Sequence, residues 1–332
     1  MNGKSGFTRR EALAFGGLLT APMLFESKAM AQTNDYPNRD IRVICAFPAG
    51  SGADVLCRFY AEGMKPHFSK PIMIENKVGA SGNLATNFVA RAAPDGYTLY
   101  IHGANSLAAN MSLFKDPGVD AGKTIECLAT VSKLAFTVCV AKDSPFKNFN
   151  DLIEAVRKKG DKASYATTAP TGQVAGAMIK EMLGLPIIEI PYRTGADSLN
   201  DLASGNLDYA MYDPTFALAQ ENAGRVRLLA IASKDRMKSM PSVPTLHELG
   251  LKDVDCVGWW ALMAPRGVPA PIKQKLSAAF LDMARSKKTE EFLVKAGTDP
   301  FILDGDEAQK FFLEEIENWR RYVKIAKMEA KG

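Results

Sequence analysis

Short apolar runs rich in β-branched residues alternate along the chain with amphipathic stretches whose apolar positions recur every three to four residues. This alternation predicts strands separated by covering helices, which is typical of α/β units with parallel sheets. We expect seven strands, over residues 41–46, 71–75, 97–101, 136–141, 187–190, 207–212 and 226–232.

Helical spacing is clearest at three places. One stretch follows Asp54, an acceptable N-cap, and a second begins at Pro269 and Pro271, as helices tolerate proline in their first turn. The third forms one apolar stripe behind Asp304 and Asp306, made of Phe312, Ile316, Trp319, Val323 and Ala326. Because Trp319 falls on that apolar face, we expect it in the core.

Residues 1–31 have the features of an export signal. Arg9 and Arg10 precede an apolar run over residues 12–25. Ala29 and Ala31 are the small residues that a signal peptidase recognises just before its cleavage site. The run is shorter than the ~20 residues that span a bilayer, so we expect cleavage after Ala31 rather than an anchor. The paired arginines fit a twin-arginine signal, but ordinary secretory signals also carry them.

Composition and charge exclude several functions. The 332 residues carry a formal charge of only +4, part of it in the signal, and no concentrated basic stripe that would bind nucleic acid. Common catalytic and nucleotide-binding patterns are absent, and His247-Glu248 lacks the second histidine of a zinc helix. We therefore expect no cofactor and no metal.

The chain contains five cysteines, all after the signal. Cys45, Cys127 and Cys139 lie in strand-like runs, so we expect buried small apolar side chains rather than a disulfide framework. A bond between Cys127 and Cys139 stays open.

No flexible linker divides the chain. We expect an α/β fold of two domains, the first made of residues 32–134 and 255–332 and the second of residues 135–254. The backbone would then cross between them more than once on ordered segments, and a cleft between the domains would be the default ligand site.

Small, glycine-rich loops follow the expected strands. The first precedes a helix, and its candidate residues are Phe47, Pro48, Ala49, Gly50, Ser51, Gly52 and Asp54. Glycines let a ligand approach the backbone, and free N–H groups at a helix start attract a carboxylate. The alternative is that this loop is an ordinary tight turn between a strand and a helix. For Asp54 we expect a role as helix cap rather than a contact with an anionic ligand.

A second loop, in the other half of the chain, offers hydroxyls and free N–H groups through Thr167, Thr168, Thr171, Gly172 and Gln173. Two such loops facing one cleft would form a clamp for a small carboxylate. Asn105 and Ser106 follow another strand on the side of the first loop, and are candidate side-chain contacts.

These loops resemble the receptors of tripartite tricarboxylate transporters, the Bug-type periplasmic solute-binding receptor family. Residues 47–54 resemble the motif F-P-P-G-G-x-[TS]-D, residues 75–83 resemble E-N-[RK]-P-G-A-x-G-N, and residues 93–99 match A-P-D-G-Y-T-L. Residues 191–196, 241–245 and 258–265 resemble further family motifs in the same order, so the resemblance covers nearly the whole chain after the signal.

The resemblance implies a two-domain type II periplasmic-binding-protein fold. Such a receptor closes on a small organic acid in the periplasm and presents it to membrane permease subunits, without catalysing a reaction. In the family the first and second loops hold the carboxylate, which here points to residues 47–52 and to Thr167, Thr168, Thr171 and Gly172. We expect a monomer.

Departures from the family pattern bear on the ligand. Ala53 replaces the usual Thr or Ser, and the second loop is shorter, with Gln173 where His is common. Tyr212-Asp213 stands where Asp-Asn is usual. Either Asp213 serves a cationic or hydroxyl-bearing part of the ligand, or Tyr212 supplies an aromatic wall, which we favour slightly.

Two other functions stay open at this level. A ligand-sensing receptor that docks on a membrane sensor would use the same clamp. An enzyme could use Cys57, near a helix start where the dipole lowers a thiol pKa, although no paired histidine is evident.

Overall fold

The computed structural model describes residues 35–332, apart from the side chains of residues 104–106. The expected export signal and its cleavage site after Ala31 lie outside the described residues. Residues Pro37–Gly332 form one unit. In this part of the chain, no helix has both the length and the apolar character needed to cross a membrane.

The first sheet has six strands in the order β11-β4-β10-β3-β1-β2. Strand β1 is parallel to β2 and β3, whereas β10 is antiparallel to both β3 and β4. The strands are β1 (Ile41–Cys45), β2 (Ile72–Asn76), β3 (Thr98–Gly103), β4 (Ile125–Ala135), β10 (Val257–Pro265) and β11 (Asp299–Pro300).

The second sheet has five strands in the order β7-β6-β8-β5-β9. Strand β6 is parallel to β7 and β8, whereas β5 is antiparallel to β8 and β9. The strands are β5 (Thr137–Ala141), β6 (Ser164–Thr167), β7 (Ile188–Pro191), β8 (Tyr209–Tyr212) and β9 (Val226–Ile231).

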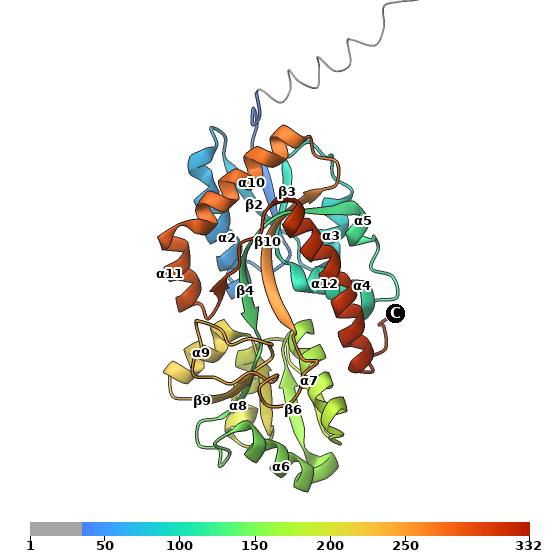
Figure 1. Cartoon of the computed structure of the whole chain (residues 1–332), viewed down its shortest axis with the longest axis vertical. Coiled ribbons are helices and arrows are strands. Elements are labelled where there is room, and N and C mark those ends of the chain that lie inside the picture. Colours follow the sequence, from blue (N-terminus) through green and yellow to red (C-terminus); the bar gives the residue numbers. More distant parts are fainter. Residues whose placement is uncertain (1–34) are drawn as a thin grey trace, which may run out of the picture. The chain divides into compact units, whose positions relative to one another are not determined.

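Each sheet with its helices is called a lobe below (Figure 1). The first lobe contains α2 (Gly52–Met64), α3 (Asn83–Ala90), α4 (Ala104–Leu113), α5 (Ala121–Thr124), α10 (Ala270–Arg285), α11 (Lys287–Lys295) and α12 (Gly305–Ile325). The second lobe contains α6 (Phe149–Lys159), α7 (Pro170–Leu183), α8 (Gly195–Ala203) and α9 (Pro214–Asn222).

All seven expected strands are confirmed to within about two residues, and so are the helices α2, α10 and α12. Trp319 is fully buried, as its place on the apolar stripe of α12 predicts. The expectation of parallel sheets is confirmed only in part: β1 to β3 and β6 to β8 pair parallel, whereas β4, β5 and β10 pair antiparallel, so both sheets are mixed. Asp54 does not cap α2; Ser51 does, by accepting a hydrogen bond from the Asp54 N–H at 3.2 Å.

The chain passes from the first sheet to the second between β4 and β5, and returns between β9 and β10. These crossings are compatible with the expected domain limits at 134/135 and 254/255, which stay a prediction. One buried apolar cluster includes Ile44 and Trp259 of the first lobe and Met178 of the second.

Helix α12 and the residues after it also connect the lobes. The helix packs against α4 in its own lobe and against α7 in the other. Lys327 pairs with Glu181 of α7 at 2.7 Å. Lys331 forms a parallel β-bridge with Phe114, and its Nζ lies 3.5 Å from the Gln173 side-chain oxygen of α7.

The five cysteines are buried free thiols. The possible bond between Cys127 and Cys139 is not formed, because Cys127 lies in β4 of the first sheet and Cys139 in β5 of the second. Their burial agrees with the role of small apolar side chains.

Candidate functional site

The parallel strands of each sheet place several loops at one edge. In the first sheet, β1, β2 and β3 end together, so the loops that follow them start side by side. In the second sheet the same holds for β6, β7 and β8, which lead into α7, α8 and α9. Each edge therefore collects helix N-termini, where backbone N–H groups lack intrahelical acceptors.

The loop between β1 and α2 exposes its backbone. Pro48, Ala49, Gly50 and Gly52 are exposed, and Ser51 is half-buried. Gly50 has a φ of +79°, which glycine adopts without strain. Among the described residues, no atom lies within 4 Å of a Cβ built at Gly50 or Gly52, so the backbone here is open to a ligand.

Asp54 supports this loop from below. Its buried carboxylate accepts hydrogen bonds from the Gly50 N–H at 2.9 Å, from Arg58 Nε at 2.7 Å and from Asn76 Nδ2 at 2.7 Å. Burial by itself raises the pKa of Asp54, but these donors outweigh it and lower the pKa to about 2. Asp54 is therefore an ionised support of the loop, with its carboxylate already engaged.

Phe47 begins the loop and covers a buried histidine. The Phe47 carbonyl accepts a hydrogen bond from Asn76 Nδ2 at 2.8 Å, and its ring lies 5.1 Å from that of His102 and 5.7 Å from that of Trp260. Among the described atoms, His102 Nδ1 has no hydrogen-bond partner. Burial lowers the pKa of His102 to about 3, so this imidazole is neutral.

A strained segment, Gly79–Gly82, follows β2 at the same edge. Ala80 and Ser81 have φ values of 46° and 54°, a conformation that costs a non-glycine residue about 1–2 kcal/mol. Asn110 of α4 holds the segment by donating from Nδ2 to the Ser81 carbonyl at 3.0 Å. Strain held in place by a buried side chain is typical of functional loops.

The second loop turns most of its side chains inward. Thr167 donates its hydroxyl hydrogen to Glu189 Oε1 at 2.6 Å, and Gln173 donates from Nε2 to the same oxygen at 2.9 Å. Thr168 is half-buried. The N-cap, Ala169, has no side-chain oxygen, so its side chain does not cap the N-terminus of α7.

Thr171 and Gly172, in the first turn of α7, are buried. A Cβ at Gly172 would lie 2.8 Å from the ring of Phe136, which stands between β4 and β5 where the chain crosses between the lobes. This glycine is therefore needed for packing against the crossing segment, not only for access to the backbone.

Tyr212 and Asp213 also have structural partners. The buried Tyr212 hydroxyl lies 2.8 Å from Ser198 Oγ, and its ring packs edge-on against Phe216 at 5.0 Å. The aromatic wall favoured above is therefore wrong, because the Tyr212 side chain belongs to the core of the second lobe. Asp213 caps α9 by accepting from the Phe216 N–H at 3.0 Å, and its burial raises its pKa.

The remaining candidates are placed as follows. Asn105 and Ser106 fall in the first turn of α4, but their side chains lie outside the described part of the structure.

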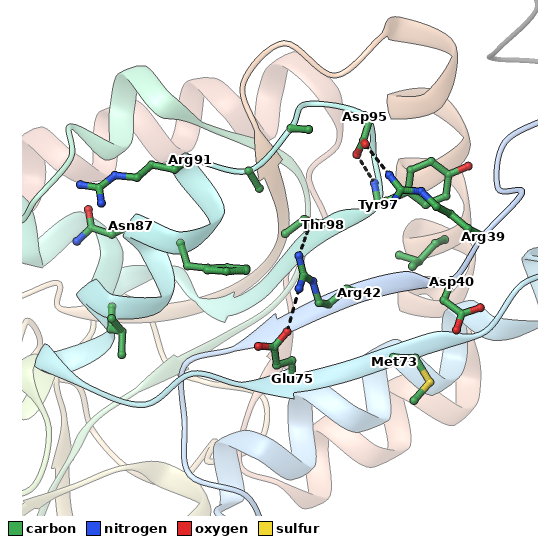
Figure 2. Close-up of a pocket in the computed structure, with 15 residues that line it drawn as sticks. Arg39, Asp40, Arg42, Met73, Glu75, Asn87, Arg91, Asp95, Tyr97 and Thr98 are labelled. Atoms are coloured by element: carbon green, nitrogen blue, oxygen red, sulfur yellow. Dashed lines mark hydrogen bonds and ion pairs between the residues drawn. The ribbon is translucent and has the colours of Figure 1, made fainter.

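A hollow of about 860 Å3 lies next to α3, toward the amino-terminal ends of β1 and β3 (Figure 2). Two guanidinium groups in it already have carboxylate partners, since Arg39 pairs with Asp95 at 2.8 Å and Arg42 with Glu75 at 3.3 Å. Arg42 also donates to Thr98 at 3.4 Å. None of the loop residues 47–54 and 167–173 is among those that line the hollow, so it is not assigned to these loops.

Sequence reasoning did not single out Arg58, Asn76, Glu189 and the strained segment 79–82 as parts of the site. The segment had a visible signal, the run Gly-Ala-Ser-Gly-Asn after a strand. Asn76 and Glu189 act through hydrogen bonds to residues 22 positions away, whereas Arg58 pairs with Asp54 one helical turn earlier.

Comparisons with known proteins agree with this architecture. The model of the tripartite tricarboxylate transporter family receptor matches residues 56–328. The periplasmic binding protein BugD is 30% identical and superposes with a TM-score of 0.77 over 89% of this chain and 100% of its own.

Two Rhodopseudomonas palustris proteins solved with ligands are also similar. Rpa4515 with adipate is 27% identical, with a TM-score of 0.79 over 90% of this chain and 100% of its own. MatC with bound malate is 26% identical, with a TM-score of 0.74 over 87% of this chain and 100% of its own. The likeness thus extends over the complete length of both proteins.

Proposed function

Because this chain belongs to the tripartite tricarboxylate transporter receptor family, we propose that it captures a small organic carboxylate between its lobes and delivers it to a membrane permease. The observation that carries the proposal is the exposed backbone at Gly50 and Gly52, held in place by the buried Asp54 carboxylate. Two related receptors were solved with the dicarboxylates adipate and malate, which supports the ligand class.

Backbone N–H groups at the start of α2 would bind one carboxylate. The first residues of a helix have no intrahelical acceptor for their N–H groups, and the helix dipole favours an anion there. Since Ala53 carries no hydroxyl and the Asp54 carboxylate is engaged below the loop, the backbone itself is the recognition element in the first lobe.

The start of α7 would complete the clamp from the second lobe. Pro170 has no N–H, so the backbone donor that this turn would offer a ligand is the N–H of Gly172. The Thr167 hydroxyl is committed to Glu189, which leaves Thr168 as the hydroxyl best placed to reach a ligand. We propose that these groups bind the same carboxylate or a second one when the lobes close.

Closure would take place at the crossings between the sheets. A ligand that contacts both lobes stabilises the closed form and shifts the population toward it. The closed form would then be recognised by the permease in the periplasm, after removal of the signal at Ala31.

The thiol-dependent alternative is disfavoured by the environment of Cys57. This side chain is buried, and a hydrogen bond to Cys45 together with burial raises its pKa well above the ordinary range. A protonated, inaccessible thiol is a poor nucleophile.

A thermal-shift and calorimetry screen tests the proposal, with adipate, malate, citrate and benzoate as probes. A bound carboxylate raises Tm by mass action on the folded state. We expect Gly52→Leu to weaken binding at least tenfold without lowering Tm, because the new side chain covers the amides of the α2 N-terminus. Asp306→Leu, on the exposed first turn of α12, serves as the matched control.

Two results would contradict the proposal. One is the absence of any Tm shift across mono-, di- and tricarboxylates. The other is unchanged affinity in Gly52→Leu, which would place the ligand elsewhere.

A further inference from the structure

The second loop lies next to a carboxylate that has no cationic partner. Glu189 Oε1 accepts hydrogen bonds from the Thr167 hydroxyl at 2.6 Å and from Gln173 Nε2 at 2.9 Å, the two residues that flank segment 168–172. Among residues 35–332, no lysine or arginine forms an ion pair with Glu189, and its Oε2 has no hydrogen-bond partner. The loop is therefore held by a negative charge that no ion pair offsets.

The other two helices that begin at this edge have acids of their own. Asp197 closes a capping box with Thr194 at the start of α8, and Asp213 caps α9. An acid at a helix N-terminus offsets the dipole that would otherwise attract an anion there. Arg193, between β7 and α8, is exposed and supplies one positive charge against the three acids. Each of these helix starts in the second lobe is thus matched by a carboxylate of the chain.

The corresponding edge of the first lobe is balanced. Asp54 pairs with Arg58 at 2.7 Å, and Glu75 pairs with Lys77 at 2.6 Å. Helices α3 and α4 have no acid in their first turns. An anion therefore binds at the first edge at a lower electrostatic cost than at the second.

We propose that Glu189 determines specificity by selecting against a second carboxylate, and that the ligand is a monocarboxylate whose other end donates hydrogen bonds through a hydroxyl or an ammonium group. This inference rests on the proposed function, because it says which end of the ligand each lobe binds. The carboxylate would lie on the amides at the start of α2, and the donor end would face Glu189 Oε2. A second carboxylate at that place would put two like charges in a water-excluded cleft.

Calorimetry on the full chain tests this with probes of equal chain length, from three to six carbons: the dicarboxylate, the ω-hydroxy acid and the ω-amino acid. We expect the hydroxy or the amino acid to bind at least about tenfold more tightly than the dicarboxylate of the same length. Glu189→Gln keeps an oxygen that can accept from the Thr167 hydroxyl but removes the charge. It should therefore reduce this affinity ratio several-fold.

A second variant and a control complete the test. Gln173→Lys places a cation beside Glu189 and should reduce the affinity ratio in the same direction. Glu181→Gln removes an equal charge from α7, where Lys327 pairs with Glu181 at 2.7 Å, and should leave the ratio unchanged. Because the ratio compares two ligands on one variant, a general loss of stability does not alter it.

Two results would overturn the inference and leave the proposed function intact. One is a dicarboxylate that binds as tightly as its hydroxy and amino counterparts. The other is an affinity ratio that stays the same in both Glu189→Gln and Gln173→Lys. If no carboxylate binds the unchanged protein, the proposed function itself fails, and this inference fails with it.

Discussion

The Asp54 carboxylate accepts a hydrogen bond of 2.9 Å from the backbone N–H of Gly50. A helix side chain thereby fixes the loop before its own helix, at a residue whose φ of +79° favours glycine. The shape of the exposed backbone therefore depends on one buried anion.

Replacement of Asp54 by Ala should loosen this loop. Gly50, Arg58 and Asn76 would each lose an acceptor, so we expect the free energy of unfolding to fall by about 1–3 kcal/mol and carboxylate affinity to fall with it. Urea denaturation and calorimetry measure the two effects. Asp306→Ala, on an exposed first turn, should change neither; an equal loss there would refute the explanation.

The same carboxylate predicts an acid-dependent loss of stability. The pKa of Asp54, about 2 in the folded protein, is lower than the ~3.9 of an unfolded chain, so ionised Asp54 stabilises the fold. Its contribution is complete above pH ~4 and is lost as the pH falls toward 2. At higher pH the urea midpoint of Asp54→Asn should lie below that of the unchanged protein by a constant amount. In acid the two midpoints should converge. A constant gap down to pH ~2 would contradict this assignment.

Asp213 should behave in the opposite way. Burial raises its pKa in the folded protein, so stability decreases as the pH rises past the unfolded value of ~3.9 and the carboxylate ionises. Asn is an equally good N-cap without the charge. Asp213→Asn should therefore raise Tm at pH 7, with no gain in acid, and leave carboxylate affinity unchanged. A clear loss of affinity would place the Asp213 carboxylate in the ligand site.

Two glycines should respond differently to a methyl group. Gly172→Ala forces a Cβ to within 2.8 Å of the Phe136 ring, and such overpacking costs about 1–3 kcal/mol. Gly52→Ala meets no described atom within 4 Å and should be neutral or stabilising by up to about 1 kcal/mol. Denaturant midpoints compare the two, and equal effects would argue against the packing role of Gly172.

The elements of the fold could be predicted because their signals are local. The apolar run at 226–231 indicates a strand, and the apolar stripe of α12 indicates a helix, from a few neighbouring residues alone. The sheet order could not be predicted in this way. Strand β10 inserts between β3 and β4, which lie far from it in the chain, and it pairs antiparallel with both.

The candidate site divides along the same line. The glycine-rich loops at strand ends were visible in the sequence, but the direction of each side chain depends on distant partners. In the sequence Thr167 is a hydroxyl that a ligand could use. In the structure it donates its hydrogen bond to Glu189, 22 residues away. Asp54 meets Asn76 across the same separation. A sequence shows which polar groups exist, not which of them are already satisfied.

The anchoring of Lys331 suggests a practical use. Its backbone is bound to Leu113 and Lys115 in the first lobe at 2.8 and 2.9 Å, while its side chain reaches Gln173 on α7. A fluorophore attached at the neighbouring Gly332 would be carried by one lobe and lie beside the other. Its emission would report lobe movement directly, which would turn the receptor into an optical sensor for its own ligand.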